Sequence, residues 1–303
     1  MMNAPRMQPE QETGNPERRG LKKGLYLIPS AFTAANIGMG FYTVMASLRA
    51  FQLMGGPGAD VSRAAVYLDN GAKAIGWALL FDMLDGRIAR LTKTTTEIGI
   101  QLDSIADVVT FGLAPAVLAY VWGYGAALTE GSDLYNLALF VSFMYLMCGA
   151  FRLARFNVQA SRPRILAEGT VKVDKKSFVG LPIPVAGGLV AAIVHFAPTP
   201  LIGYGPARAE LYSVLMIVLT GFLSVLMVST MRFSSFKTVG TSSRSMRTVI
   251  LAVGTGMLIF LFSKYVLLAI VIAYILHGFL SRLVALFRRR SDLGGSKVQA
   301  KEI

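Results

Sequence analysis

Long apolar runs alternate with short polar segments along most of this 303-residue chain. Most of the runs reach or approach the roughly 20 residues that a helix needs to cross a bilayer. The pattern therefore predicts an all-α polytopic membrane protein with about eight transmembrane helices. The predicted spans are Leu25–Leu48, Ile75–Leu84, Val108–Trp122, Leu134–Leu153, Leu181–Phe196, Leu211–Met231, Val249–Phe262 and Tyr265–Leu286.

The two ends of the chain lack this pattern. Residues 1–24 are rich in Pro, Glu, Gln and Arg and have little apolar surface to bury, which is typical of a disordered tail. Residues 288–303 form a second polar segment, rich in basic residues. We therefore expect one integral-membrane domain, residues 25–287, between two cytoplasmic tails.

The composition agrees with a membrane protein, because 54% of the residues are hydrophobic and only 16% are charged. A soluble protein has about 25% charged residues. The net charge of +13 raises the possibility of a nucleic-acid partner. However, when the basic residues are assigned to alternate sides of eight spans, 25 of the 30 lysines and arginines fall on one side. This asymmetry predicts an inner-membrane protein with both termini in the cytoplasm, facing anionic lipids and binding no nucleic acid.

Four aspartates interrupt the apolar pattern around the second and third spans. Asp82 and Asp85 lie near the end of the second span, and Asp103 and Asp107 lie just before the third. Spacings of three and four residues place each pair on one face of a helix. A short loop joins the two helices, so we expect the two acidic faces to converge.

Each charged aspartate in a membrane costs about 2.5–3.5 kcal/mol on insertion scales, and less near the interface. Arg87 and Arg90 are too few to compensate four such charges. Divalent cations prefer hard carboxylate oxygens and would neutralise the cluster. Two ions about 3.5–4 Å apart are a known device for in-line phosphoryl displacement, so the cluster indicates phosphoryl transfer.

The segment from Asp82 to Asp107 reads D-x-x-D-G-x-x-A-R, eight further residues, then G-x-x-x-D-x-x-x-D. It matches the motif of the CDP-alcohol phosphotransferase family without gap or substitution. The first span resembles the family's first helix at Pro29, Thr33 and Asn36, although Ser30 replaces the usual asparagine. The resemblance implies a core of six helices, followed here by two more, and a homodimer.

The resemblance also implies roles for individual residues. Asp82, Asp85 and Asp103 would coordinate two Mg²⁺ or Mn²⁺ ions, and Asp107 would share in the site and act as general base. For Thr33 and Asn36, helix–helix hydrogen bonding is the alternative. The residues expected to bind CDP-diacylglycerol are Thr33, Asn36, Asp82, Gly86, Arg90 and Gly99.

Further segments resemble the bacterial integral-membrane phosphatidylserine synthases within this family. These segments are Leu102–Ala116, Cys148–Asn157, Phe178–Gly188 and Arg232–Lys237. The implied reaction is the transfer of a phosphatidyl group from CDP-diacylglycerol to L-serine with release of CMP. Glycerol 3-phosphate, inositol phosphate and choline are alternative acceptors.

Arg152 and Arg155 end the fourth predicted span on the side of the aspartates. They suit the carboxylate of serine or a lipid phosphate, or else they anchor the helix end as other cytoplasmic arginines do.

No Ser–His or Cys–His pair offers a covalent nucleophile, so we expect direct displacement without a covalent enzyme intermediate. His195 and His277 are expected to be packing or interface residues.

A cation transporter is the alternative from another functional class, because intramembrane acids often mark ion pathways. Transporters commonly repeat such a site in both halves, whereas here every intramembrane acid lies between Asp82 and Asp107. A purely structural scaffold would give no reason for the unfavourable acids. The sequence therefore favours the enzyme.

Overall fold

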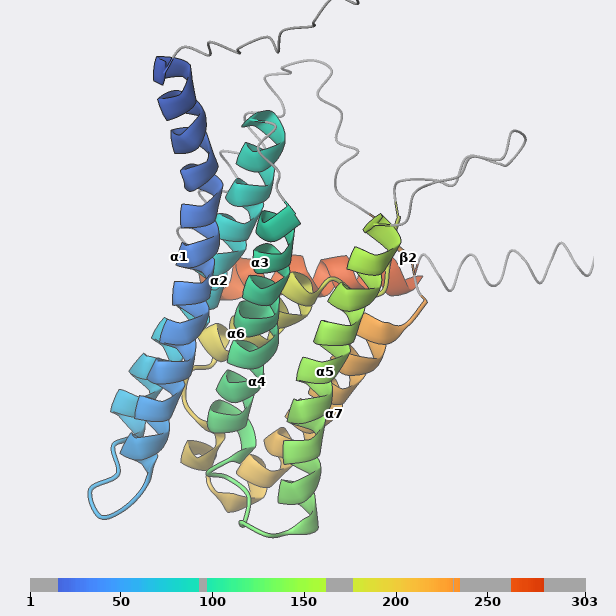
Figure 1. Ribbon diagram of the computed structural model, residues 1–303. Coiled ribbons are helices and arrows are strands. Elements are labelled where there is room, and N and C mark those ends of the chain that lie inside the picture. Colours follow the sequence, from blue (N-terminus) through green and yellow to red (C-terminus); the bar gives the residue numbers. More distant parts are fainter. Residues whose placement is uncertain (1–15, 93–96, 162–176, 231, 235–262, 281–303) are drawn as a thin grey trace, which may run out of the picture.

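The computed structural model describes residues 16–92, 97–161, 177–230, 232–234 and 263–280. Most of the labelled helices run side by side along one common direction (Figure 1). Within the described residues, the only strands are β1 (Ser177–Val179) and β2 (Arg232–Ser234), which form one short antiparallel pair. The predicted all-α fold is confirmed apart from this pair.

Helices α1 (Pro16–Met54) and α2 (Val61–Thr92) form an antiparallel hairpin. The turn between them contains Gly56 and Gly58, whose φ angles of 85° and 99° disfavour other residues. Both helices extend beyond the predicted apolar spans, because polar and acidic residues reduce hydropathy without ending a helix. The α1 helix begins at Pro16, a residue type favoured in a first helical turn. Residues 16–24, which were expected to be disordered, are therefore helical, because the first membrane helix continues into them.

The third predicted span is one continuous helix of four segments. These are α3 (Glu97–Asp107), the π-helical η1 (Val108–Leu113), α4 (Ala114–Ala119) and the π-helical η2 (Tyr120–Tyr124). Pro115 in α4 has no N–H to donate to the carbonyl of Phe111. The buried Tyr145 hydroxyl donates to that carbonyl instead, at 3.1 Å. The carbonyl of Phe111, which the proline leaves without a helical donor, is therefore hydrogen-bonded within the apolar interior.

The remaining labelled helices are α5 (Asp133–Ser161), α6 (Ile183–Phe196), the 3₁₀ segment η3 (Leu201–Tyr204) and α7 (Pro206–Val228). Five helices in the described part of the chain are long and apolar enough to cross a membrane: Glu97–Tyr124, Asp133–Val158, Ile183–Tyr204, Pro206–Val228 and Ser263–Leu280. The predicted span Val249–Phe262 lies outside the described residues.

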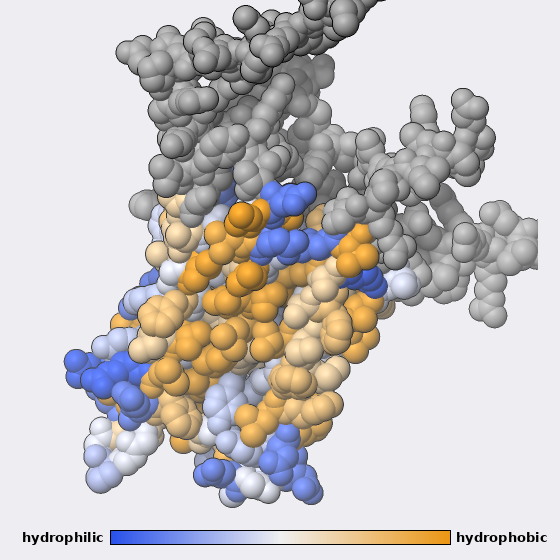
Figure 2. All heavy atoms as spheres, viewed as in Figure 1, coloured by the Kyte–Doolittle hydropathy of each residue, from blue (hydrophilic) through white to orange (hydrophobic). Residues whose placement is uncertain are grey.

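The surface has the polarity that a bilayer requires. Large apolar side chains that are more than half exposed occur on several helices, including Phe41, Trp77, Phe140, Val218 and Val225. Figure 2 shows hydrophobic residues across the middle of the visible face, with hydrophilic residues at its ends. Exposed apolar area of this extent is stable when lipid covers it. The protein is therefore a multi-pass membrane protein.

A close contact between α1 and η1 fixes the position of the first helix. A Cβ on Gly40 would lie 2.7 Å from Thr110 Oγ1 and 2.9 Å from Thr110 Cα. Only glycine permits this approach, whereas a Cβ on Gly38 would meet nothing within 4 Å. At the same contact Thr110 Oγ1 donates to the carbonyl of Asn36 at 3.0 Å. These interactions hold Asn36 and Thr33, one turn earlier, against the interior.

Candidate active site

Three of the four aspartates converge between α2 and α3. One carboxylate oxygen each from Asp82, Asp85 and Asp103 lies within 4.8 Å of the other two. The two helices are consecutive and antiparallel, so the end of α2 and the start of α3 lie at the same end of the molecule (Figure 1). The spacing on each helix then directs the acidic faces at each other.

Asp107 lies one turn beyond Asp103. Among the described residues, the group of convergent carboxylates does not include it. Asp107 is 8% exposed, and its Oδ1 has no hydrogen-bond partner among the described residues. Asp107 interacts electrostatically with the three other aspartates and with Arg152 on α5. The charges of the other aspartates and of the arginine therefore both act on this carboxylate.

The donor set fits divalent cations. The Oδ1 atoms of Asp103 and Asp107 are both buried without a partner among the described residues. The salt bridges among the described side chains join Asp69 to Lys73 and His195, and involve none of the four clustered aspartates. Leaving several carboxylates buried and uncompensated is strongly unfavourable. Hard cations with several oxygen ligands are the compensation that this chemistry favours.

Helix α1 adds polar groups to the cluster. Thr33 Oγ1 donates to Asp85 Oδ2 at 3.2 Å. Asn36 is fully buried, and neither its Oδ1 nor its Nδ2 has a hydrogen-bond partner among the described residues. Such a buried amide is unfavourable unless a ligand or water completes its hydrogen bonds. Thr33 is thus linked to the acid cluster itself, and Asn36 offers a donor and an acceptor one turn away.

The other residues predicted to bind nucleotide are less fully described. Gly86 follows Asp85 on α2 and is partly buried, while Gly99 is exposed in the first turn of α3. The side chain of Arg90 lies outside the described residues. The roles of these three residues stay predictions.

The two arginines of α5 have different surroundings. Arg152 is 7% exposed, and its Nε has no hydrogen-bond partner among the described residues. Arg155 instead donates from Nη1 to the carbonyl of Val228 at 3.2 Å, and from Nη2 to that of Ser229 at 3.5 Å. A cation at these carbonyls complements the negative end of the α7 dipole. Of the two, Arg152 is the one whose charge interacts with Asp107, and an acceptor role for Arg155 stays a prediction.

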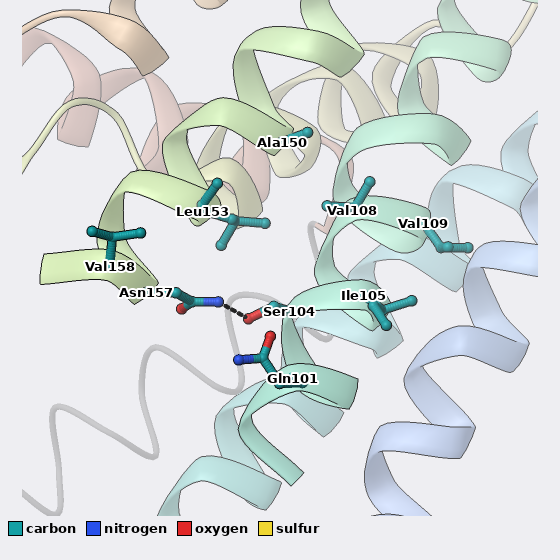
Figure 3. A pocket seen from close by; sticks show the side chains of 10 residues that line it. Gln101, Ser104, Ile105, Val108, Val109, Ala150, Leu153, Asn157 and Val158 are labelled. Atoms are coloured by element: carbon teal, nitrogen blue, oxygen red, sulfur yellow. Dashed lines mark hydrogen bonds between the residues drawn. The ribbon is translucent and has the colours of Figure 1, made fainter. Parts of the chain in front are cut away.

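A groove between α3–η1 and α5 was not foreseen from the sequence. It encloses about 740 Å³. In Figure 3, Gln101, Ser104 and Asn157 form its polar end, and apolar side chains such as Val108 and Leu153 line the rest. Asn157 Nδ2 donates to Ser104 Oγ at 2.8 Å. This bond links α5 to α3 next to Asp103. The only sign of it in the sequence was a polar residue in each segment, namely Ser104 beside Asp103 and Asn157 at the end of Cys148–Asn157.

The structure brings a serine and a histidine together at a place away from the acid cluster. His195 Nε2 lies 3.0 Å from Ser263 Oγ, and His195 Nδ1 contacts Asp69. However, Asp69 precedes Asp82 by 13 residues on α2, which corresponds to about 20 Å along a helix. The pair was invisible in the sequence, since its members are far apart along the chain. At this distance it offers no nucleophile to the acid cluster, so direct displacement remains our expectation.

The sequence is similar to those of known proteins. The sequence model of one protein family, described as CDP-alcohol phosphatidyltransferase, matches residues 26–225. That range contains Thr33, the four aspartates and Arg152, and it ends within α7. The family match therefore covers the whole of the candidate active site.

Individual proteins are also similar to this chain over half of its length or more. The CDP-diacylglycerol–serine O-phosphatidyltransferase of Helicobacter pylori is 35% identical over 222 residues, which are 71% of this chain and 75% of that protein. The protein of the same name from Saccharomyces cerevisiae is 37% identical over 156 residues, 52% of this chain and 49% of its own. The archaetidylserine synthase of Methanothermobacter thermautotrophicus is 33% identical over 168 residues, 55% of this chain and 58% of its own.

The resemblance that the aspartate motif indicated is thereby confirmed. The family match covers most of the chain, and the similarity to the H. pylori enzyme reaches well beyond the motif. The chain is an enzyme, and it belongs to the CDP-alcohol phosphatidyltransferase family.

Proposed function

We propose that this enzyme transfers the phosphatidyl group of CDP-diacylglycerol to the hydroxyl group of L-serine and releases CMP. The observation that carries the proposal is the acid cluster next to the buried Arg152. A phosphoryl-transfer site beside a cation suits an acceptor that bears a carboxylate. The names of the bacterial and yeast relatives support serine as that acceptor.

Two Mg²⁺ or Mn²⁺ ions are the cofactors that we propose. Asp82, Asp85 and Asp103 would hold them, with Asp107 sharing in the site, and the three convergent oxygens support this assignment. When bound, the ions would neutralise the pyrophosphate and the charge that develops during its displacement. The buried amide of Asn36 and the hydroxyl of Thr33 would contact the cytidine end of the lipid substrate.

Asp107 is the general base in this proposal. Its unpartnered Oδ1 takes the proton from the serine hydroxyl, whose oxygen then bonds to the β-phosphorus. The bond from that phosphorus to the bridging oxygen breaks, and CMP leaves with the electron pair. Burial of Asp107 keeps water away from the reacting oxygen. The products are phosphatidylserine and CMP.

Orientation and assembly belong to the same proposal. We place the acid cluster near the cytoplasmic face of the inner membrane, with both termini in the cytoplasm, because 25 of the 30 basic residues fall on that side of the predicted spans. Residues 25–287 would form the membrane domain, and residues 1–24 and 288–303 its cytoplasmic tails. A homodimer is the assembly that we expect.

The choice of acceptor is tested with purified enzyme in detergent or vesicles. CDP-diacylglycerol is supplied with L-serine, glycerol 3-phosphate, inositol phosphate or choline, and released CMP is measured. We expect release with L-serine at a rate at least about 100-fold above that with choline, since a site that pairs a buried charge rejects an acceptor lacking it. Glycerol 3-phosphate and inositol phosphate also carry negative charge, and we expect less release with them because the named relatives use serine. Release with another acceptor alone would reject serine but retain the reaction type.

Replacing Arg152 with glutamine should raise KM for L-serine by about 10- to 100-fold, as expected when a charged group loses its hydrogen bonds. KM for CDP-diacylglycerol should change little. Arg155→Gln is the matched comparison, because its guanidinium binds the carbonyls at the end of α7. That variant should lower Tm, and its KM for serine tests the predicted acceptor role of Arg155 separately. An unchanged serine KM in Arg152→Gln would contradict the assignment.

A further inference from the structure

The groove of about 740 Å³ between α3–η1 and α5 has no part in the phosphoryl transfer described above. Each of its two walls is one face of a helix (Figure 3). The wall from α3–η1 includes Gln101, Ile105 and Val108, and the wall from α5 includes Leu153 and Asn157. Residues three and four positions apart lie on the same face of a helix. The two helices therefore turn one continuous face each toward the groove.

The polarity of the groove changes along its length. At one end Asn157 Nδ2 donates to Ser104 Oγ at 2.8 Å, and Gln101 lies beside them (Figure 3). Farther along the two helices, apolar side chains such as Val108 and Leu153 line the walls. Binding sites for small molecules commonly combine apolar walls with a few polar groups that fix the orientation of the ligand. This groove suits a ligand with a long apolar part and a polar group at one end.

The polar end of the groove adjoins the acid cluster. Ser104 directly follows Asp103, which contributes one of the three convergent carboxylate oxygens, and Gln101 precedes Asp103 by two residues. From this end the groove continues along α3 into η1, toward the middle of the apolar helix Glu97–Tyr124. A lipid with its phosphates at the acid cluster would have its glycerol esters near the polar end. Its acyl chains would then follow the direction of the groove.

We propose that one acyl chain of the lipid substrate lies in this groove and that its ester carbonyl accepts a hydrogen bond from the amide of Gln101. Ser104 Oγ already donates to the carbonyl of Ile100 at 3.0 Å and accepts from Asn157. Gln101 is exposed at the same end, and its amide is a hydrogen-bond donor. This inference rests on the proposed function, because it takes CDP-diacylglycerol as the substrate. It adds the place of one chain and a residue that recognises the ester linkage.

The role of Gln101 is tested with Gln101→Met, which keeps the length of the side chain and removes the amide. KM is measured for CDP-diacylglycerol and for a CDP-dialkylglycerol of equal chain length, whose ether links have no carbonyl. We expect KM for the diacyl lipid to rise about 3- to 10-fold, the range for one uncharged hydrogen bond. KM for the dialkyl lipid should stay within about twofold of wild type, because that lipid makes no such bond.

Gln52→Met is the matched control, because Gln52 is exposed near the turn between α1 and α2 and accepts from Arg49. It should leave both KM values unchanged. Equal rises for the two lipids in Gln101→Met, or no rise for either, would overturn the assignment of Gln101 to the ester. Because both lipids are measured with the same acceptor, a wild-type preference for another alcohol would reject serine without deciding this comparison.

The place of the chain is tested without any acceptor, with CDP-diacylglycerol that carries a photoreactive diazirine in the middle of its acyl chains. After irradiation, the labelled peptides should contain Val108 or Leu153, and excess unlabelled CDP-diacylglycerol should prevent the labelling. Ala154→Phe adds a ring to the exposed rim of the groove and should remove most of the label. Ala273→Phe, at an exposed position of the helix Ser263–Leu280, is the control and should not.

Each other occupant of the groove gives a different result. Label on these residues that excess CDP-diacylglycerol fails to displace would mean that any bilayer lipid enters the groove. Label found only elsewhere would mean that the groove is closed to the substrate, as a second copy of the chain packed over it would require. Either result would overturn the inference. Should Ala154→Phe fail to fold, the labelling and competition in the wild-type protein still decide.

Discussion

Asp107→Asn will reduce turnover by about 10²- to 10⁴-fold, the usual contribution of a general base. Asparagine keeps the size of the side chain but accepts no proton at the corresponding position. Asp107 is buried, and its Oδ1 has no partner among the described residues. The proposal assigns the three other carboxylates to the metal ions, so none of them is expected to replace Asp107 as the base. The measurement is CMP release at saturating CDP-diacylglycerol and serine.

The control is Asp133→Asn, which makes the same chemical change in the exposed first turn of α5. That variant should keep wild-type turnover. Both proteins should insert into membranes in equal amounts and give the same elution volume in detergent. Wild-type turnover in Asp107→Asn would refute the assignment of the base, whereas equal losses in both variants would point to a general effect on folding.

The acid cluster was predictable because it depends on local geometry. Spacings of three and four residues define helix faces, and a short loop makes consecutive helices neighbours. From these two rules alone all four aspartates were expected to meet, and one oxygen each from Asp82, Asp85 and Asp103 lies within 4.8 Å of the others. Only the structure shows that Asp107 lies outside this group of three, because a displacement of one helical turn along α3 is enough to separate it from the other carboxylates.

Contacts between distant segments were not predictable from one sequence. Arg155 and Val228 are 73 residues apart, and His195 and Ser263 are 68 apart. Hydrophobic periodicity shows which face of a helix is buried but not which helix covers it. For the same reason the sequence could not distinguish Arg152 from Arg155.

Helix lengths were underestimated where polar residues enter a membrane helix. The second predicted span, Ile75–Leu84, occupies only the middle of α2, which runs from Val61 to Thr92. Hydropathy falls at Asp69, Lys73 and Asp85, yet none of these residues breaks a helix. The additional turns matter for function, since they carry Asp85 and Gly86 past the apolar span to the end where α3 begins.

A chelator such as EDTA should abolish activity, with a loss of at least about 100-fold, and added Mg²⁺ or Mn²⁺ should restore it. The expectation follows from three convergent carboxylates that no described lysine or arginine pairs with. Because the ions bind only the folded site, they should also raise Tm in the absence of substrate, and the rise should grow with ion concentration. This second measurement is independent of turnover.

Asp85→Asn distinguishes a metal site from a cluster with another role. It removes one charged ligand but retains an oxygen that can accept from Thr33. We expect the Mg²⁺ concentration for half-maximal activity to rise about 10-fold or more, in line with losses seen when the surroundings of a metal are altered. Asp69→Asn, an acid on the same helix bonded to Lys73 and His195, should leave this concentration unchanged. Full activity in EDTA, or a Tm that no divalent ion alters, would exclude the metal site while leaving the family assignment intact, because that assignment rests on the sequence match over residues 26–225.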